Sequence, residues 1–250
     1  MRGLEGRNVI VTGGGGAIGA AICRRFAGYG AKVGVFDKNL AGAKTVAQEI
    51  KGLASGVDIT DYEAVAKAIA QFENDTGPTD ILVNNAGWDK FVNFIDTTPQ
   101  LWDQIIAINL RGPVNMSHVV LKGMVARGHG RVVNIASDAG RVGSSQEAVY
   151  SACKGGIIAF TKTVAREVAR KGITLNAVCP GPTETPLLAA AAGEGERGER
   201  MRAALINAIP MKRVGQPDDI PGAVCFLASD DAAFITGQTI SVSGGLTMHG

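Results

Sequence analysis

Short runs of β-branched and other apolar residues alternate along the chain with longer segments in which apolar residues recur every three or four positions. The short runs predict strands at residues 9–11, 33–36, 81–83, 132–135 and 173–178. Because these runs are almost continuously apolar, we expect a sheet that is covered on both faces.

The longer segments have the spacing of helices with one buried face. The predicted buried stripes are Ile18, Ile22 and Phe26; Val65, Ile69 and Phe72; and Ile157, Phe160, Val164 and Val168. Strands that alternate with helices are typical of βαβ units. We therefore predict an α/β fold, a single domain over residues 1–250 with a Rossmann-like, doubly wound parallel sheet in a three-layer α/β/α sandwich. In such folds ligands bind beyond the carboxyl ends of the strands.

A segment at about 186–215 breaks this alternation. It is rich in alanine and then in glycine, glutamate and arginine, with a charged stretch at 193–198 that we interpret as a hinge, and helical character returns from Met201 to Ile209. The segment follows a strand end, so we favour a substrate lid over an ordinary solvated loop.

The amino-acid composition limits the kinds of molecule that the protein can be expected to bind. The chain has 250 residues, 25 basic and 23 acidic, so it offers no charge excess for nucleic acid or an anionic membrane. It shows neither a signal peptide pattern nor an apolar run of about 20 residues, which favours the cytoplasm. The cysteines and histidines lack metal-ligand spacing, so we expect buried free thiols and no metal, and a small molecule as partner.

A glycine-rich turn follows the first strand and precedes a helix, the arrangement that binds a pyrophosphate at a helix N-terminus. Its candidate cofactor-binding residues are Gly13, Gly15, Gly16, Ala17, Ile18 and Gly19. Asp37 ends the second strand about twenty residues later, where a carboxylate binds an adenosine ribose and repels a 2′-phosphate. This favours NAD over NADP, although Asp37 can also be an ordinary surface residue and Lys38 can weaken the repulsion.

Two further strand ends carry small or polar residues. We expect Asp58 and Ile59 to end the third strand, and residues 84–87, which include Asn85, Ala86 and Gly87, to end the fourth. These positions are candidates for contacts with the adenine and its ribose.

Tyr150 and Lys154 are four residues apart at the start of the longest helical pattern, so their side chains share one helix face. A neighbouring ammonium lowers the pKa of a phenol, which makes Tyr150 a candidate acid/base. Ser137, after the strand at 131–135, is placed to bind a substrate oxygen, and Asn109 is expected to begin a helix. A tyrosine and a lysine at this spacing also occur as a plain surface pair.

These motifs together resemble the short-chain dehydrogenase/reductase family over nearly the whole chain. The similar segments are 12–19, 84–87, Asn109, Ser137, Tyr150, Lys154, Pro180-Gly181 and 241–245, and Ala17 replaces a glycine found in many members. The resemblance implies a catalytic tetrad of Asn109, Ser137, Tyr150 and Lys154, with Tyr150 and Lys154 also contacting NAD. It further implies that Pro180, Gly181, Thr183 and Thr185 lie near the nicotinamide, and that the enzyme is a homotetramer.

Segments 84–89, 134–145 and 235–248 are similar to family members of bacterial alicyclic and aromatic acid degradation. This implies NAD-dependent oxidation of 2-hydroxycyclohexanecarboxyl-CoA or a related 3-hydroxyacyl-CoA. Trp88, Arg141 and Gln146 are candidates for the substrate pocket, although each can equally be a loop residue. Arg197, Arg200 and Arg202 are possible contacts for CoA.

Other functions stay open at this point. A 3-oxoacyl carrier-protein reductase or a dehydrogenase of cyclic or secondary alcohols would use the same chemistry, and Asp37 disfavours the reductase, which usually prefers NADPH. A non-catalytic NAD-binding redox sensor would not need the four residues of the tetrad. A structural protein would leave the glycine turn unexplained.

Overall fold

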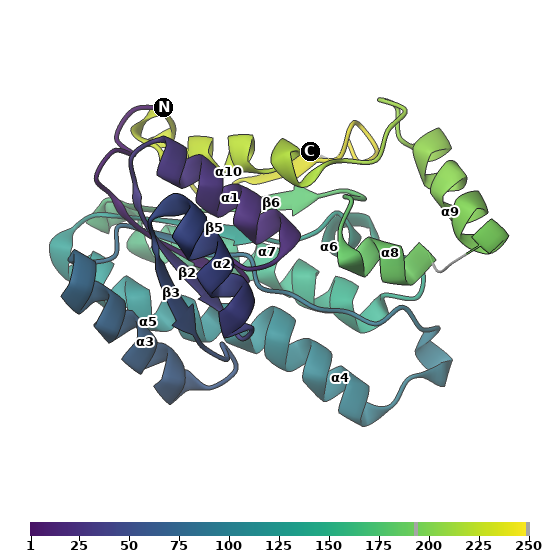
Figure 1. The fold of residues 1–250 in the computed structure, drawn as a ribbon, viewed down its shortest axis with the longest axis horizontal. Coiled ribbons are helices and arrows are strands. Elements are labelled where there is room, and N and C mark those ends of the chain that lie inside the picture. Colours follow the sequence, from purple (N-terminus) through teal and green to yellow (C-terminus); the bar gives the residue numbers. More distant parts are fainter. Residues whose placement is uncertain (193–194, 249–250) are drawn as a thin grey trace.

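The computed structural model describes residues 1–192 and 195–248, and its core is one parallel sheet (Figure 1). The strands are β1 Asn8–Thr12, β2 Lys32–Asp37, β3 Leu53–Gly56, β4 Ile81–Asn84, β5 Gly130–Ile135, β6 Ile173–Pro180 and β7 Thr239–Val242. Their spatial order is β3-β2-β1-β4-β5-β6-β7, with every pair parallel. The order reverses between β1 and β4, which is where this class of sheet opens a crevice for ligands.

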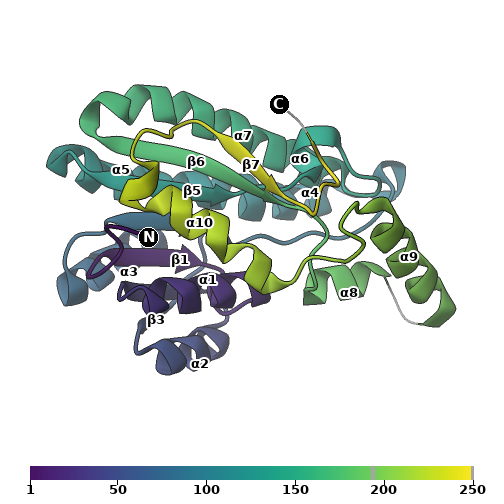
Figure 2. The same cartoon turned by 90° about the horizontal axis from the view of Figure 1, so that it is seen from above.

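Helices cover both faces of the sheet, as the apolar strands predict (Figure 2). The helices are α1 Ala17–Gly28, α2 Leu40–Ile50, α3 Tyr62–Thr76, α4 Pro99–Ile106, α5 Gly112–Arg127, α6 Ala139–Val142, α7 Ala148–Val168, α8 Pro186–Ala192, α9 Gly195–Ala208 and α10 Pro221–Ala228. Buried residues of α1, α2 and α10 form one core layer, and those of α3, α5 and α7 form the other. The single-domain, doubly wound α/β sandwich is therefore confirmed.

Short turns of other helical types complete the connections. They are η1 Phe94–Asp96, the π-helical η2 Ala107–Arg111, η3 Ala169–Lys171, η4 Pro217–Asp219 and η5 Asp230–Ala232. Side chains cap several of the main helices: Asn39 accepts from Gly42 N at the start of α2, and Asp61 accepts from Ala64 N at the start of α3. Such caps fix where each helix begins, and so where the preceding strand end lies.

Three details of the sequence prediction are wrong. Two strands end earlier than expected: β3 ends at Gly56 and β4 at Asn84, so Asp58, Ile59 and residues 85–87 lie in the loops that follow. In α7 the helix turns Thr161 and Ala165 toward the core, and Phe160 and Val164 are only half-buried. Residues 195–198, expected to be hinge, already belong to α9, while 193–194 lie outside the described residues.

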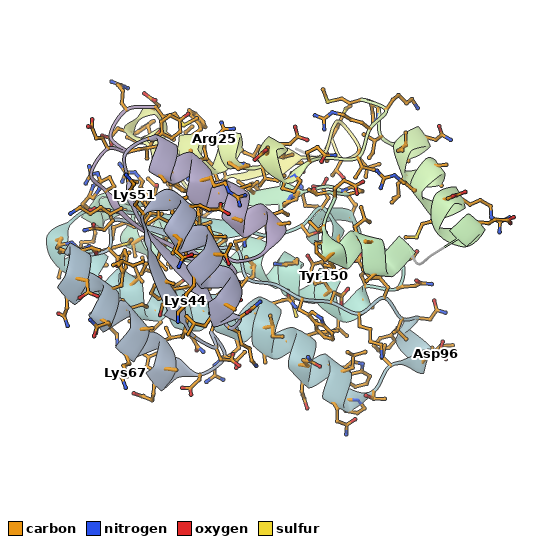
Figure 3. All side chains as sticks on the ribbon, viewed as in Figure 1. Arg25, Lys44, Lys51, Lys67, Asp96 and Tyr150 are labelled. Carbon is orange, nitrogen blue, oxygen red and sulfur yellow. The ribbon has the colours of Figure 1, made fainter. Side chains whose placement is uncertain are left out.

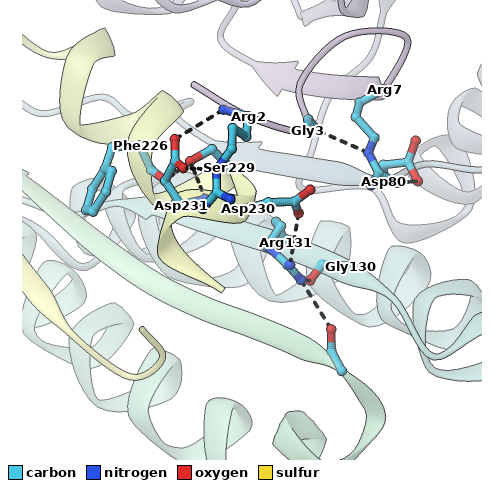
Figure 4. A network of polar contacts seen from close by, with 11 residues as sticks. Arg2, Gly3, Arg7, Asp80, Gly130, Arg131, Phe226, Ser229, Asp230 and Asp231 are labelled. Atoms are coloured by element: carbon cyan, nitrogen blue, oxygen red, sulfur yellow. Dashed lines mark hydrogen bonds and ion pairs between the residues drawn. The ribbon is translucent and has the colours of Figure 1, made fainter. Parts of the chain in front are cut away.

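The amino ends of the strands are joined by a network of ion pairs (Figure 4). Arg131 is only 7% exposed, donates to the carbonyls of Gly130 and Gly172 at 3.0 and 3.2 Å, and lies 3.5 Å from Asp230. Arg2 pairs with Asp231 at 2.6 Å, and Arg7 pairs with Asp80 at 3.4 Å. The network ties the N-terminal segment to η5, which is far from it in sequence.

The segment with α8 and α9 projects beyond the carboxyl ends of the strands, on the side opposite the N-terminus (Figure 1). Its two ends are joined at the base by a parallel bridge between Thr183 and Gly215. Within it, Arg202 of α9 forms an ion pair of 2.5 Å with Glu184. The segment is therefore a helical excursion that starts and finishes at one point of the sheet edge.

None of the helices in the described part of the chain is both long enough and apolar enough to cross a membrane. All four cysteines are buried and free, as expected.

Candidate active site

The glycine turn after β1 is shaped by close backbone contacts. Gly13 has a φ of 63°, and a Cβ there would lie 2.8 Å from the Ala86 Cα, so the position needs glycine. A Cβ at Gly15 would lie 2.9 Å from the Ala43 backbone N, and a Cβ at Gly19 would collide with the Gly13 carbonyl oxygen. The first βα turn is therefore held tightly against α2 and the segment after β4.

Helix α1 begins at Ala17, and its N-cap residue Gly16 places no side chain over the first backbone N–H groups. Those N–H groups and the positive end of the helix dipole fit a pyrophosphate. A cavity of about 660 Å³ opens beside the turn and is lined in part by Gly15, Gly16 and Ala17. The sequence expectation that the turn holds a dinucleotide is compatible with this cradle, and Ala17 and Ile18 fit it as the first helical residues.

Asp37 lies directly behind the glycine turn. Its carboxylate accepts from Gly15 N at 3.0 Å and from Asn39 N at 2.8 Å. Lys38, which the sequence suggested could offset this charge, instead forms an ion pair of 2.7 Å with Asp58 and holds the pKa of that carboxyl below its usual range. Among the described residues, Asp37 therefore has no ammonium or guanidinium group paired with it.

The loop after β4 is fastened to β1 by Thr12, which the sequence reasoning did not single out. Its hydroxyl accepts from Asn85 N and Ala86 N at 3.0 and 3.1 Å, and Asn85 Nδ2 donates to the Thr12 carbonyl at 3.0 Å. Gly87 follows at an exposed position. Ile59, by contrast, is 7% exposed, so little of its side chain is open to a ligand.

The four residues of the predicted tetrad come together at the carboxyl edge. Lys154 is 3% exposed; its ammonium donates to the Ile135 carbonyl at 2.9 Å and lies 5.5 Å from the centre of the Tyr150 ring. A Cβ at Gly87 would lie 3.0 Å from Asn109 Oδ1 and 3.4 Å from Lys154 Nζ, so both groups border the same glycine. The Ser137 hydroxyl accepts from Ala139 N at 3.1 Å, and its interaction with Tyr150 acts to lower the pKa of that phenol. Figure 3 shows Tyr150 on the same side of the ribbon as α8.

The electrostatics of this edge differ from the simple expectation that Lys154 lowers the pKa of Tyr150. Burial is the largest effect and raises the pKa of Tyr150; the Glu147 carboxyl raises it further, and the hydrogen bond with Ser137 acts in the opposite direction. Burial also lowers the pKa of Lys154 to about 8. Without a cofactor, Tyr150 is therefore a neutral phenol at physiological pH.

The expectation that Asn109 begins a helix is wrong. Asn109 lies inside the π-helical turn η2, between α4 and α5. Its side chain is fully buried: Nδ2 donates to the carbonyls of Trp88 and Ile105 at 2.6 and 2.9 Å, and Oδ1 accepts from Trp88 N at 3.2 Å. Single π turns often mark functional positions within helices. Here the turn directs Asn109 toward the loop after β4.

The predicted substrate residues occupy different settings. Trp88 is half-buried and held through its backbone by Asn109. Arg141 lies in α6, and its guanidinium donates to the Ser241 hydroxyl at 2.9 Å; Ser241 in turn donates to the buried Asp138. Gln146 is exposed and has a φ of 68°. Arg141 thus has a partner on β7, and Gln146 marks a tight turn before α7.

The residues at and after the end of β6 make hydrogen bonds and close contacts that fix the local backbone. Pro180 ends the strand, and a Cβ at Gly181 would lie 2.7 Å from the Ser243 Cβ. The Thr183 hydroxyl donates to the Gly181 carbonyl at 2.9 Å, and the Thr185 hydroxyl accepts from Leu188 N at 3.2 Å. These hydroxyls lie close to the carboxyl edge, and their contact with a nicotinamide stays a prediction.

The candidate CoA contacts lie on α9. Arg200 faces Glu196 at 3.8 Å, and Arg202 is paired with Glu184. The side chain of Arg197 falls outside the described residues.

Two acidic residues of this edge were missed. Asp89 lies in the loop after β4 and is 4% exposed, and Glu147 is the half-buried residue before α7. Each adjoins a motif that the sequence shows, but nothing in the sequence indicated that Asp89 is buried in the fold.

Comparison with known proteins identifies the class. A protein family described as enoyl-(acyl carrier protein) reductase matches residues 15–247. Taken with the fold and the Ser137, Tyr150 and Lys154 geometry, this match shows that the chain belongs to the short-chain dehydrogenase/reductase family. It is therefore an oxidoreductase, and the family uses a nicotinamide cofactor.

Individual relatives narrow the comparison. The chain is 44% identical over 240 residues to an acetoacetyl-CoA reductase of Rhizobium meliloti (strain 1021) and 45% identical over 240 residues to one of Shinella zoogloeoides, in each case covering 96% of this chain and 98% of the relative. It is 38% identical over 249 residues to a 3-oxoacyl-[acyl-carrier-protein] reductase of Vibrio harveyi, covering 98% of this chain and 99% of that protein.

Proposed function

We propose that the protein is an NAD-dependent 3-oxoacyl thioester reductase, which interconverts a 3-oxoacyl and a 3-hydroxyacyl group carried on CoA or on an acyl carrier protein. The observation that carries this proposal is the convergence of Ser137, Tyr150 and Lys154 beside the glycine turn. The acetoacetyl-CoA and 3-oxoacyl-[acyl-carrier-protein] reductases among its relatives support the thioester substrate.

A bound nicotinamide would supply hydride to the carbonyl carbon in reduction and accept it in oxidation. Tyr150, as the phenol, donates its proton to the carbonyl oxygen while the C=O π bond breaks, and Ser137 donates a hydrogen bond to the same oxygen. Lys154, fixed by the Ile135 carbonyl, keeps a positive charge near the phenolate that results. Asn109 holds the backbone of Trp88 at the border of the site.

The residues of the glycine turn would hold the pyrophosphate, and Asp37 would accept hydrogen bonds from the adenosine ribose. In the part of the chain that the structure describes, no cationic side chain is paired with the Asp37 carboxylate, which supports NAD rather than NADP. We further propose that α8 and α9 act as the substrate lid, that the protein is a cytoplasmic homotetramer, and that Trp88 contributes to the acyl pocket.

The similarity of segments 84–89 and 134–145 to enzymes of alicyclic acid degradation favours a narrower reading, a 2-hydroxycyclohexanecarboxyl-CoA dehydrogenase. The reductases among the relatives support the broader thioester chemistry better than this cyclic substrate. The cyclic thioester is therefore one arm of the test and not the conclusion.

The test compares initial rates with acetoacetyl-CoA, a 3-oxoacyl carrier protein, 2-hydroxycyclohexanecarboxyl-CoA, and cyclohexanol as the unactivated alcohol, each with NAD(H) and NADP(H). We expect a thioester to exceed cyclohexanol in kcat/KM by at least about a hundredfold. A preference for the simple alcohol would overturn the thioester proposal.

A further inference from the structure

Asp138 directly follows Ser137 and carries a buried carboxylate. The residue is 5% exposed, its Oδ1 accepts a hydrogen bond from the Ser241 hydroxyl, and among the described residues no donor meets its Oδ2. Its backbone is held as well: Asp138 N donates to the Pro180 carbonyl at 3.2 Å, and the Asp138 carbonyl accepts from Arg141 N at 2.9 Å. Burying a carboxylate is costly unless donors compensate it, so the hydrogen bond from Ser241 stabilises this placement.

Ser241 connects this carboxylate to a positive charge. It lies on β7 and is paired in the sheet with Cys179 of β6. Its hydroxyl accepts a hydrogen bond from the Arg141 guanidinium at 2.9 Å and donates its own hydrogen to Asp138. A hydroxyl that accepts from a cation donates more strongly, because hydrogen bonds in a chain polarise one another. The three residues Asp138, Arg141 and Ser241 thus join α6 to β7, and we call them the β7 brace.

The turn that the β7 brace holds is the one that carries Ser137. The Ser137 hydroxyl accepts from Ala139 N at 3.1 Å, and the Ser137 carbonyl accepts from Gly140 N at 3.0 Å. Gly140 lies against α7, because a Cβ there would lie 2.6 Å from the Lys154 carbonyl carbon and from Gly155 N. The position of the Ser137 hydroxyl therefore depends on α7 at one side of the turn and on β7 at the other.

We propose that the β7 brace positions Ser137, fixing its hydroxyl where it donates to the substrate oxygen. Asp138, Arg141 and Ser241 act through Ser137, so they are positioning residues and not catalytic residues. The proposal rests on the role proposed above for Ser137. A displacement of about 1 Å in a group that binds the reacting atoms can slow a reaction about a hundredfold, so loss of the brace has a measurable effect.

The first measurement is a double-mutant cycle on kcat between Ser137 and Ser241, with the substrate of the panel above that is turned over fastest. Ser241→Ala should lower kcat about tenfold, and Ser241→Thr, which keeps a hydroxyl, should retain most of the wild-type rate. In the Ser137→Ala background, Ser241→Ala should lower kcat less than about twofold, because no hydroxyl is left to position.

Thr239→Val is the matched control for this cycle. It removes a hydroxyl from the same strand, two residues before Ser241, that has no hydrogen-bond partner among the described residues, so kcat should be unchanged. If the losses of Ser137→Ala and Ser241→Ala multiply in the double variant, Ser241 acts independently of Ser137; the brace is then wrong and the proposed function stands. Full activity in Ser137→Ala would overturn the role of Ser137 and the brace with it.

The second measurement needs no substrate. Amide hydrogen exchange at residues 139–143 should be about tenfold faster in Ser241→Ala and in Asp138→Asn than in the wild type, and Thr239→Val should match the wild type. Unchanged exchange in this segment would overturn the brace even where kcat falls. Faster exchange in a protein that turns over no thioester would support the brace and contradict the proposed function.

Discussion

Buried charged residues at the two ends of the parallel sheet differ in the partners that they have. At the amino end each of Asp80, Asp230 and Asp231 has an arginine partner, and the network joins segments distant in sequence (Figure 4). At the carboxyl end the buried Lys154 ammonium donates to the Ile135 carbonyl, and among the described residues neither oxygen of the buried Asp89 has a hydrogen-bond partner. Uncompensated buried charge costs stability, so its presence at one end indicates that this end is shaped for chemistry.

The largest expected effect at the carboxyl end comes from Tyr150→Phe. Removing the hydroxyl removes the proton donor, so kcat should fall by about a thousandfold or more. The glycine turn is untouched, and cofactor affinity should therefore change little. Steady-state rates together with a fluorescence titration of NADH measure both quantities. Substantial residual turnover would show that another group moves the proton.

At the amino end the expected effect is on stability and not on rate. Arg131→Met removes the guanidinium hydrogen bonds to Gly130 and Gly172 and leaves Asp230 without its partner, and we expect the free energy of unfolding to fall by about 2 kcal/mol. Denaturant unfolding measures it, and kcat should stay within a factor of two or so. Arg2→Met, at an exposed ion pair, is the matched control and should change neither. A large loss of kcat in Arg131→Met would contradict the view that the amino end serves stability and the carboxyl end serves catalysis.

A smaller effect is expected at the cofactor side of the carboxyl end. Asp37→Ala removes the carboxylate that would bind the ribose, so the ratio of kcat/KM for NAD to that for NADP should fall by about tenfold. Lys38→Met removes the nearby ammonium and should raise the same ratio. Steady-state values of kcat/KM with NAD and with NADP, measured at the same pH, test both expectations. If the ratio is unchanged in Asp37→Ala, another group distinguishes the ribose of NAD from the 2′-phosphate of NADP.

Much of this architecture can be predicted from the sequence, because the spacing of apolar residues indicates the strands and helices and the order of the motifs indicates the site. The apolar runs give the inner strands, and the glycine turn, Asp37 and the Tyr150–Lys154 spacing mark the carboxyl edge in linear order. β3 is short and only partly buried, with the sequence LASG, so its end could not be located from hydrophobicity.

What the sequence could not give are contacts between segments far apart in the chain. The hydrogen bond from Val92 N to the Gln146 carbonyl joins the loop after β4 to the turn before α7, and the sequence carries no pattern for it or for the π turn at Asn109. The direction of the Tyr150 pKa shift likewise depends on burial, which the spacing of Tyr150 and Lys154 in the sequence does not show.

The bridge between Thr183 and Gly215 brings the two ends of the excursion to one point of the sheet edge. Everything from Glu184 to Val214 can therefore be exchanged as a cassette, because its ends meet and the seven strands do not pass through it. Under the proposed role of this segment as the substrate lid, exchanging it would change which substrate is accepted and leave Tyr150 and Lys154 in place. Grafting this segment between relatives is thus a practical route to new specificities.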